Sequence, residues 1–168
     1  MLFLGHLGIG LETARPFRRG LPLKPLLLGT ILPDLIDKPL YYGLSWTTGL
    51  RGAELGLISG TRTFGHTLLF TAALAGLAAA RRSKVVAALA LGSAAHLLLD
   101  VVSDLCTHSA VSPLRVLAWP LLGWRFPDYP YEGLGGHLHH FREPFFIYAE
   151  LIGAALLLLE WRRRRRPL

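Results

Sequence analysis

The sequence has a single cysteine, Cys106, and few acidic residues: 11 Asp and Glu stand against 18 Lys and Arg in 168 residues. A single thiol excludes an internal disulfide framework and metal sites of the CxxC type. The excess of basic residues gives a formal charge of +7. Neither stacking aromatics nor a recognised nucleic-acid fold accompanies the basic runs, so we do not expect nucleic acid as a partner.

What the chain has instead is apolar sequence, with 52% hydrophobic residues, 17% charged residues and a mean hydropathy of +0.41. Its basic residues are gathered in short clusters that each adjoin an apolar segment, as at the cytoplasmic ends of membrane helices, where anionic lipid headgroups attract them. These clusters are Arg15, Arg18 and Arg19; Arg81, Arg82 and Lys84; and Arg162 to Arg166. The N-terminal "MLFLGHLGIGLE" has no basic leader, so we expect no cleaved signal peptide.

Apolar runs predict helices at roughly 2–14, 21–33, 66–81, 85–105 and 145–161. The expected fold is an all-α, polytopic membrane bundle of about four to five helices, some short or broken, forming one domain over residues 1–168. Pro22, Pro25 and Pro33 favour a broken second helix. We expect a loop over 40–63, with or without a surface helix, an interfacial excursion over 107–143, and a cytoplasmic basic tail over 162–168.

The positive-inside rule places several polar residues at one depth. If the turn "RRSK" at 81–84 faces the cytoplasm, His66 lies about 15 residues before it, and His96 and Asp100 about 12 to 16 residues after it. At ~1.5 Å per residue, all three lie roughly 18–24 Å from the turn. Asp34 and His6 fall on the same half by the same reasoning. We therefore predict one shared site in the non-cytoplasmic half of the membrane.

The types of these residues suit a metal ion. His96 and Asp100 in "GSAAHLLLDVVSD" are four residues apart on one helix face, and "LPDLID" places Asp34 three residues before Asp37. Mixed imidazole and carboxylate donors suit zinc, or manganese or iron at higher coordination number. Asp34, Asp37, His66, His96 and Asp100 could hold one ion, and His6 a second. Two ions about 3.5–4 Å apart would suit phosphoester hydrolysis.

Each residue also has a purely structural interpretation. Asp34 could cap a helix, Asp37 could form a surface pair with Lys38, and His66 could cap or hydrogen-bond near a helix start. His96 and Asp100 could be a hydrogen-bonded pair, and His6 a core histidine. The segment "HLHHFRE" at 137–143 could be a solvated loop.

The succession "GHLG", "LPDLID", "RTFGHTLLF", "GSAAHLLLDVVSD" and "PLRVLAWPLLGWRF" resembles the bacterial inner-membrane, metal-dependent hydrolases of the LexA-regulated, YdjM-like group, over roughly residues 1–127. The resemblance implies location in the bacterial inner membrane and a hydrolytic reaction. It also implies metal ligands at His6, Asp34, His66, His96 and Asp100. The chain departs from the family at Thr61, where the family usually has a histidine, and in a Pro-Asp motif that is one residue longer.

A fainter similarity is to the soluble zinc phospholipase C and single-strand nuclease superfamily. His108 would match a further ligand there, and His139 with Glu143 would match a His-x-x-x-Glu pair. That similarity implies Asp100 bridging ions in a site that holds up to three.

The expected function is hydrolysis of a phosphoester, of a lipid or lipid-linked compound, near the non-cytoplasmic face. Arg62 would stabilise a developing oxyanion or hold a phosphate. A membrane metallopeptidase would need a general base, for which Asp37 or Glu143 could serve. A metal or proton transporter would also place His and Asp within the membrane, and a structural membrane protein could use a metal ion to tie its helices together.

Overall fold

The computed structural model describes residues 3–107, 112–128 and 143–165, and these parts contain helices and no strand. The all-α prediction is confirmed. The described residues form seven α-helices, which is more than the four to five expected. They are α1 (Phe3–Ala14), α2 (Leu23–Gly29), α3 (Leu32–Thr48), α4 (Leu68–Arg81), α5 (Lys84–Cys106), α6 (Pro113–Leu117) and α8 (Pro144–Arg165). Three 3-10 helices join them: η1 (Arg15–Phe17), η2 (Gly52–Leu55) and η3 (Phe64–His66).

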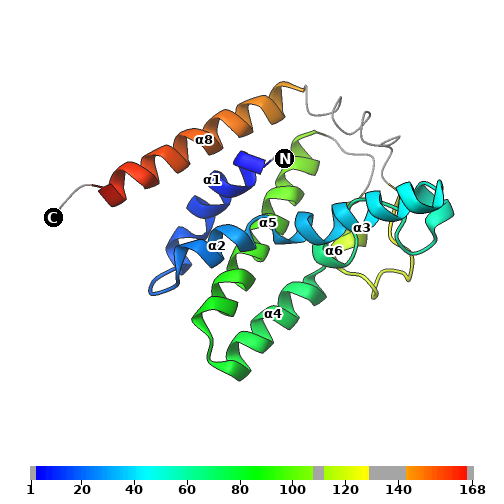
Figure 1. Cartoon of the computed structure of the whole chain (residues 1–168), viewed down its shortest axis with the longest axis horizontal. Coiled ribbons are helices and arrows are strands. Elements are labelled where there is room, and N and C mark those ends of the chain that lie inside the picture. The colour runs from blue at the N-terminus through cyan, green and yellow to red at the C-terminus, as the bar shows by residue number, and fades with distance from the viewer. Residues whose placement is uncertain (1–2, 108–111, 129–142, 166–168) are drawn as a thin grey trace.

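Helix α5 is the centre of the molecule. It packs against α1, α2, α3, α4 and α6. Helix α8 packs along α1, on the side of α1 that faces away from α5 (Figure 1). Ser83 begins α5, because its hydroxyl accepts a hydrogen bond from the N–H of Val86. Every element of the candidate site therefore lies on α5 or beside it.

The chain breaks within the segment 21–33, where a broken second helix was expected: α2 covers its first part, and α3 starts at its end. Thr30 ends α2, and α3 begins at Leu32 with Pro33 in its first turn, where proline is tolerated because no intrahelical N–H is needed. Over 40–63, where a loop with or without a helix was expected, residues 40–48 are helical, since α3 runs through Pro39 to Thr48. It ends at Gly49, whose φ of 75° is left-handed.

Two glycine pairs bring helix backbones into contact. A Cβ on Gly92 of α5 would lie 2.4 Å from the carbonyl oxygen of Leu26 in α2, and a Cβ on Gly153 of α8 would lie 2.1 Å from that of Leu4 in α1. Such small-residue crossings are typical of helix packing in membranes. They also set the position of the site, because His96 follows Gly92 by about one turn.

The first and third basic clusters meet at one end of the α1–α8 pair. Glu160 in α8 is 7% exposed, and its carboxylate pairs with Arg15 and Arg18 of the first cluster, each at 3.2 Å, and with Arg164 of the third at 2.9 Å. At the other end, Glu150 accepts hydrogen bonds from the backbone N–H groups of Leu4 (2.8 Å) and Gly5 (2.9 Å). Glu150 thereby satisfies donors at the start of α1 that the helix leaves unpaired.

Helices α5 and α8 are long and apolar enough to cross a bilayer, with mean hydropathies of 2.0 and 1.5 over their most apolar windows. Helix α4 is apolar but has only 14 residues, fewer than the ~20 that a typical span needs.

Replacing Gly153 by alanine should separate α1 from α8, because the added methyl group has no room beside the α1 backbone. We expect G153A to lose about 1–3 kcal/mol of stability, measured as a lower midpoint of thermal unfolding in detergent. Gly76 lies in α4 with open space where its Cβ would be, so G76A is the matched control. It should be neutral or gain up to about 1 kcal/mol from helix propensity. Equal effects of the two substitutions would contradict the crossing.

Candidate metal centre

The imidazole rings of His66 and His96 face each other at the core of the molecule. Their Nε2 atoms are 3.2 Å apart, and the two side chains come from η3 and from the middle of α5. His96 is 0% exposed and His66 is 2% exposed. Both rings are therefore enclosed by the surrounding protein.

The outer nitrogens of both rings are held by acceptors. His96 Nδ1 lies 2.8 Å from the carbonyl oxygen of Thr30, and His66 Nδ1 lies 2.7 Å from Asp37 Oδ2. A carbonyl oxygen can only accept, so Nδ1 of His96 carries the proton, and an ionised Asp37 requires the same of His66. In the neutral rings, both Nε2 atoms then present lone pairs to one another.

Asp37 holds the loop that carries His66. Its buried carboxylate accepts hydrogen bonds from the backbone N–H groups of Thr63 (2.7 Å), Gly65 (3.0 Å) and His66 (3.3 Å). Burial raises the pKa of Asp37, but the hydrogen bonds from the His66 imidazole and the backbone outweigh it, so the pKa lies below its usual value. Asp37 is thus an orienting carboxylate behind the ring, and its predicted pairing with Lys38 is wrong.

Two further carboxylates approach the Nε2 atoms of these rings. Asp34 Oδ1 lies 3.5 Å from His66 Nε2, and Asp100 Oδ2 lies 3.5 Å from the Nε2 atoms of both His66 and His96. For zinc ligands at 2.0–2.1 Å, the edges of a tetrahedron are about 3.3–3.4 Å long. The observed separations of 3.2–3.5 Å fit this spacing.

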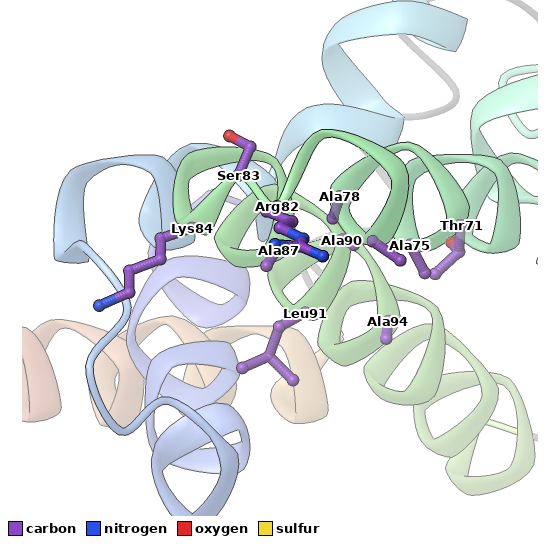
Figure 2. A pocket seen from close by; sticks show the side chains of 11 residues that line it. Thr71, Ala75, Ala78, Arg82, Ser83, Lys84, Ala87, Ala90, Leu91 and Ala94 are labelled. Atoms are coloured by element: carbon purple, nitrogen blue, oxygen red, sulfur yellow. The ribbon is translucent and has the colours of Figure 1, made fainter.

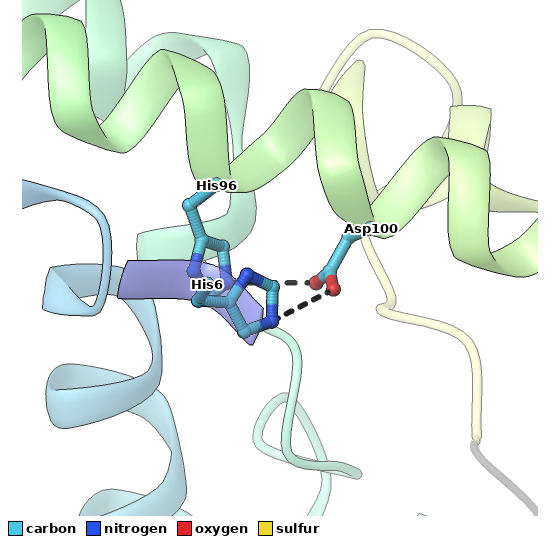
Figure 3. Close-up of side chains that lie close together, drawn as sticks. All are labelled: His6, His96 and Asp100. Carbon is cyan, nitrogen blue, oxygen red and sulfur yellow. Dashed lines mark ion pairs between the residues drawn. The ribbon is translucent and has the colours of Figure 1, made fainter. Parts of the chain in front are cut away.

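His6 extends the cluster from α1. Its ring stacks on that of His96 with centroids 4.0 Å apart, and its Nε2 lies 3.5 Å from Asp100 Oδ1 (Figure 3). Its buried Nδ1 has no hydrogen-bond partner within the described residues. Two ligand groups could therefore hold a metal ion: His6, His96 and Asp100 form one, and Asp34, His66 and His96 form the other.

Arg62 pairs with the oxygen of Asp100 that faces the imidazoles. Its Nε is 3.2 Å from Asp100 Oδ2, and its Nη1 donates to Asp104 Oδ2 at 2.7 Å. Asp104 was not predicted as a site residue, although it continues the His96–Asp100 spacing of "HLLLDVVSD" by one more turn. The guanidinium thus fixes one oxygen of Asp100, a positioning role that the sequence did not indicate. Its expected contact with a phosphate stays a prediction.

Two helix-capping interpretations are wrong. The N-cap of α3 is Ile31, so Asp34 lies in the first turn, where Lys38 pairs with it at 2.6 Å. The N-cap of α4 is Thr67, whose hydroxyl accepts the N–H of Phe70, so His66 does not cap that helix.

The remaining predicted residues are outside this cluster or outside the described chain. Glu143 is exposed at the residue before α8, and neither ligand group in the described residues includes it. His108 and His139 lie outside the described residues.

Comparison with models of protein families, with curated proteins and with solved structures finds no match to this chain. The case for a metal centre therefore depends on the geometry of the five residues His6, Asp34, His66, His96 and Asp100.

Replacing Asp37 by asparagine should weaken metal binding, because an amide holds the Nδ1–H of His66 less strongly than a carboxylate does. We expect the zinc affinity of D37N to fall about 10–100-fold, measured by competition with a chromophoric chelator. E54Q removes the same charge from an exposed position in η2 and should leave the affinity unchanged. Circular dichroism separates weaker binding from unfolding. A folded D37N with full affinity would contradict the orienting role.

Proposed function

We propose that this chain is an integral membrane, metal-dependent hydrolase with a zinc-type centre at the His66–His96 pair. One observation carries the proposal: His96 belongs to two triads of side chains, Asp34–His66–His96 and His6–His96–Asp100, and the ligand atoms within each triad lie within 4.8 Å of one another. The closest of these atoms, the imidazole Nε2 atoms and the carboxylate oxygens, are 3.2–3.5 Å apart.

A cation explains this arrangement better than a hydrogen-bonded cluster does. The two Nε2 atoms face each other at 3.2 Å, and burying two lone pairs without a donor between them is unfavourable. Asp34 and Asp100 already pair with Lys38 and Arg62, but each also has an oxygen 3.5 Å from an imidazole Nε2. A divalent ion would bind the imidazole nitrogens and these carboxylate oxygens together.

When bound, such an ion supplies Lewis acidity and lowers the pKa of a coordinated water. The chain's own residues supply the setting for that chemistry. Thr30 and Asp37 fix the ring orientations, and Arg62 holds Asp100. A cavity of about 10 Å³ borders His66, Asp100 and Arg62, which is about the space that one water molecule needs.

The polarity of the residues around this water-sized cavity would suit an amphiphilic substrate. Its other lining residues are apolar: Leu97, Val101, Pro113, Val116 and Leu117. A phosphoester of a lipid or lipid-linked compound would place its charged group toward Arg62 and its apolar part along α5 and α6. The resemblance to the YdjM-like hydrolases supports the same reaction class.

The charge distribution supports a site on the non-cytoplasmic half. Lys84, at the start of α5, precedes His96 by about 18 Å of helix, so the basic hairpin and the centre lie at different depths. By the positive-inside rule, the hairpin would face the cytoplasm. The C-terminal arginines at the end of α8 would then face it too.

Metal content tests the proposal directly. The purified full-length protein should hold one or two equivalents of zinc by elemental analysis, and H96A and D100N should lose most of it, because each removes a ligand from the centre. D128N removes an exposed carboxylate in the described part of the chain and should retain the metal. The wild type and D128N alone should hydrolyse a phosphodiester or a phospholipid in a substrate screen.

The other functional classes give different results in the same samples. Unchanged metal content in both H96A and D100N would rule out the centre. Metal-dependent flux into liposomes without turnover would make the protein a transporter. Metal removal that only lowers the unfolding midpoint, with no activity to lose, would make the ion structural.

A further inference from the structure

A groove runs between α4 and α5, next to the turn that joins them. Its volume is about 540 Å³, and Arg82, Ser83 and Lys84 form one end of it (Figure 2). Leu91 and six small side chains line its length: Ala75, Ala78, Ala79, Ala87, Ala90 and Ala94. None of the five candidate metal ligands borders it, so this is a different site.

The groove exists because most of the side chains between the two helices are alanine methyl groups. Ala78 and Ala90 lie at its base, each 7% exposed, and are too short to fill the space above them. Thr71 also lines the groove, but its hydroxyl hydrogen-bonds to Ser93 Oγ at 3.0 Å. The hydroxyl is therefore already paired within the protein. The surface along the helices is therefore apolar, and its charge is at the turn.

The cations at the turn lack counterions within the described part of the chain. The sequence has no Asp or Glu from residue 55 to residue 99. Among the described residues, no carboxylate forms an ion pair with Arg81, Arg82 or Lys84, whereas Arg15 and Arg18 of the first basic cluster pair with Glu160. These exposed cations are therefore available to an anion from outside the described part of the chain.

We propose that the groove binds an anionic phospholipid, with one acyl chain along the alanines and the phosphate at Arg82 and Lys84. From Lys84 to Ala94 the groove follows ten residues of helix, or about 15 Å. That length is half of the ~30 Å hydrocarbon core, which is the depth of one lipid leaflet. The headgroup then lies at the membrane surface on the basic side, where anionic lipids gather.

Charge favours a lipid over a second copy of the chain. Two copies joined through this face would bring two unpaired sets of Arg81, Arg82 and Lys84 together, and like charges at an interface repel. The inference depends on the proposed membrane location but not on metal chemistry.

Native mass spectrometry of the full-length protein tests this site, with dioleoyl phosphatidylglycerol or dioleoyl phosphatidylcholine added in neutral detergent. We expect one phosphatidylglycerol to be retained in preference to phosphatidylcholine. Each cation near the phosphate contributes about a fivefold preference. The double variant R82A/K84A should therefore lose about 25-fold. R81A removes a charge from the same turn outside the groove and should lose less than R82A does.

A second pair of variants separates the groove from general attraction to charge. A87F keeps every cation but fills the groove, and it should abolish the retained lipid. A80F adds the same ring at an exposed position that does not line the groove, and it should bind as the wild type does. Metal content measured in the same samples reports on the hydrolase centre independently.

Three outcomes would overturn the lipid site. One is equal retention of the two lipids. Another is full phosphatidylglycerol binding by A87F. The third is a dimer that A87F dissociates and phosphatidylglycerol leaves intact, which would assign the groove to a second copy.

Discussion

The two hydrogen bonds behind the facing imidazoles determine how the centre is built. Because Thr30 and Asp37 accept the Nδ1 protons, the Nε2 atoms of His96 and His66 must point inward. Each bond also ties a separate part of the chain to the centre: the end of α2, and the α3 helix with the η3 loop. The ring orientations and the arrangement of the helices around α5 therefore depend on one another.

Backbone packing brings these groups within reach. The Gly29–Gly92 crossing brings α2 close enough to α5 for the carbonyl of Thr30 to meet His96, and the Gly8–Gly153 crossing seats α1, which carries His6, against α8. Side chains larger than hydrogen at these points would separate the helices by more than a hydrogen bond tolerates. The glycines thus determine where the side chains of the centre lie, although they are not part of it.

The buried polar groups and the basic clusters lie at different positions along the helices. The buried centre, with Arg62 paired to both Asp100 and Asp104, lies in the middle and later part of α5, whereas the basic hairpin lies at its start. Of the three basic clusters, only the first and the third form ion pairs among the described residues, through Glu12 and Glu160. In a membrane, this arrangement would place the basic hairpin and the candidate metal centre at different depths.

Helical rise and charge placement were enough to predict from the sequence that His66, His96 and Asp100 share one depth, because both depend only on spacing along the chain. The distinct roles of Asp34 and Asp37, the pairing of Arg62 with Asp104 and the acceptor at Thr30 came only from the tertiary structure. Spacing determines how far along a helix a residue lies. Which neighbour its side chain meets depends on how the helices rotate against one another, and here that rotation is set by backbone contacts at glycines that no local pattern reveals.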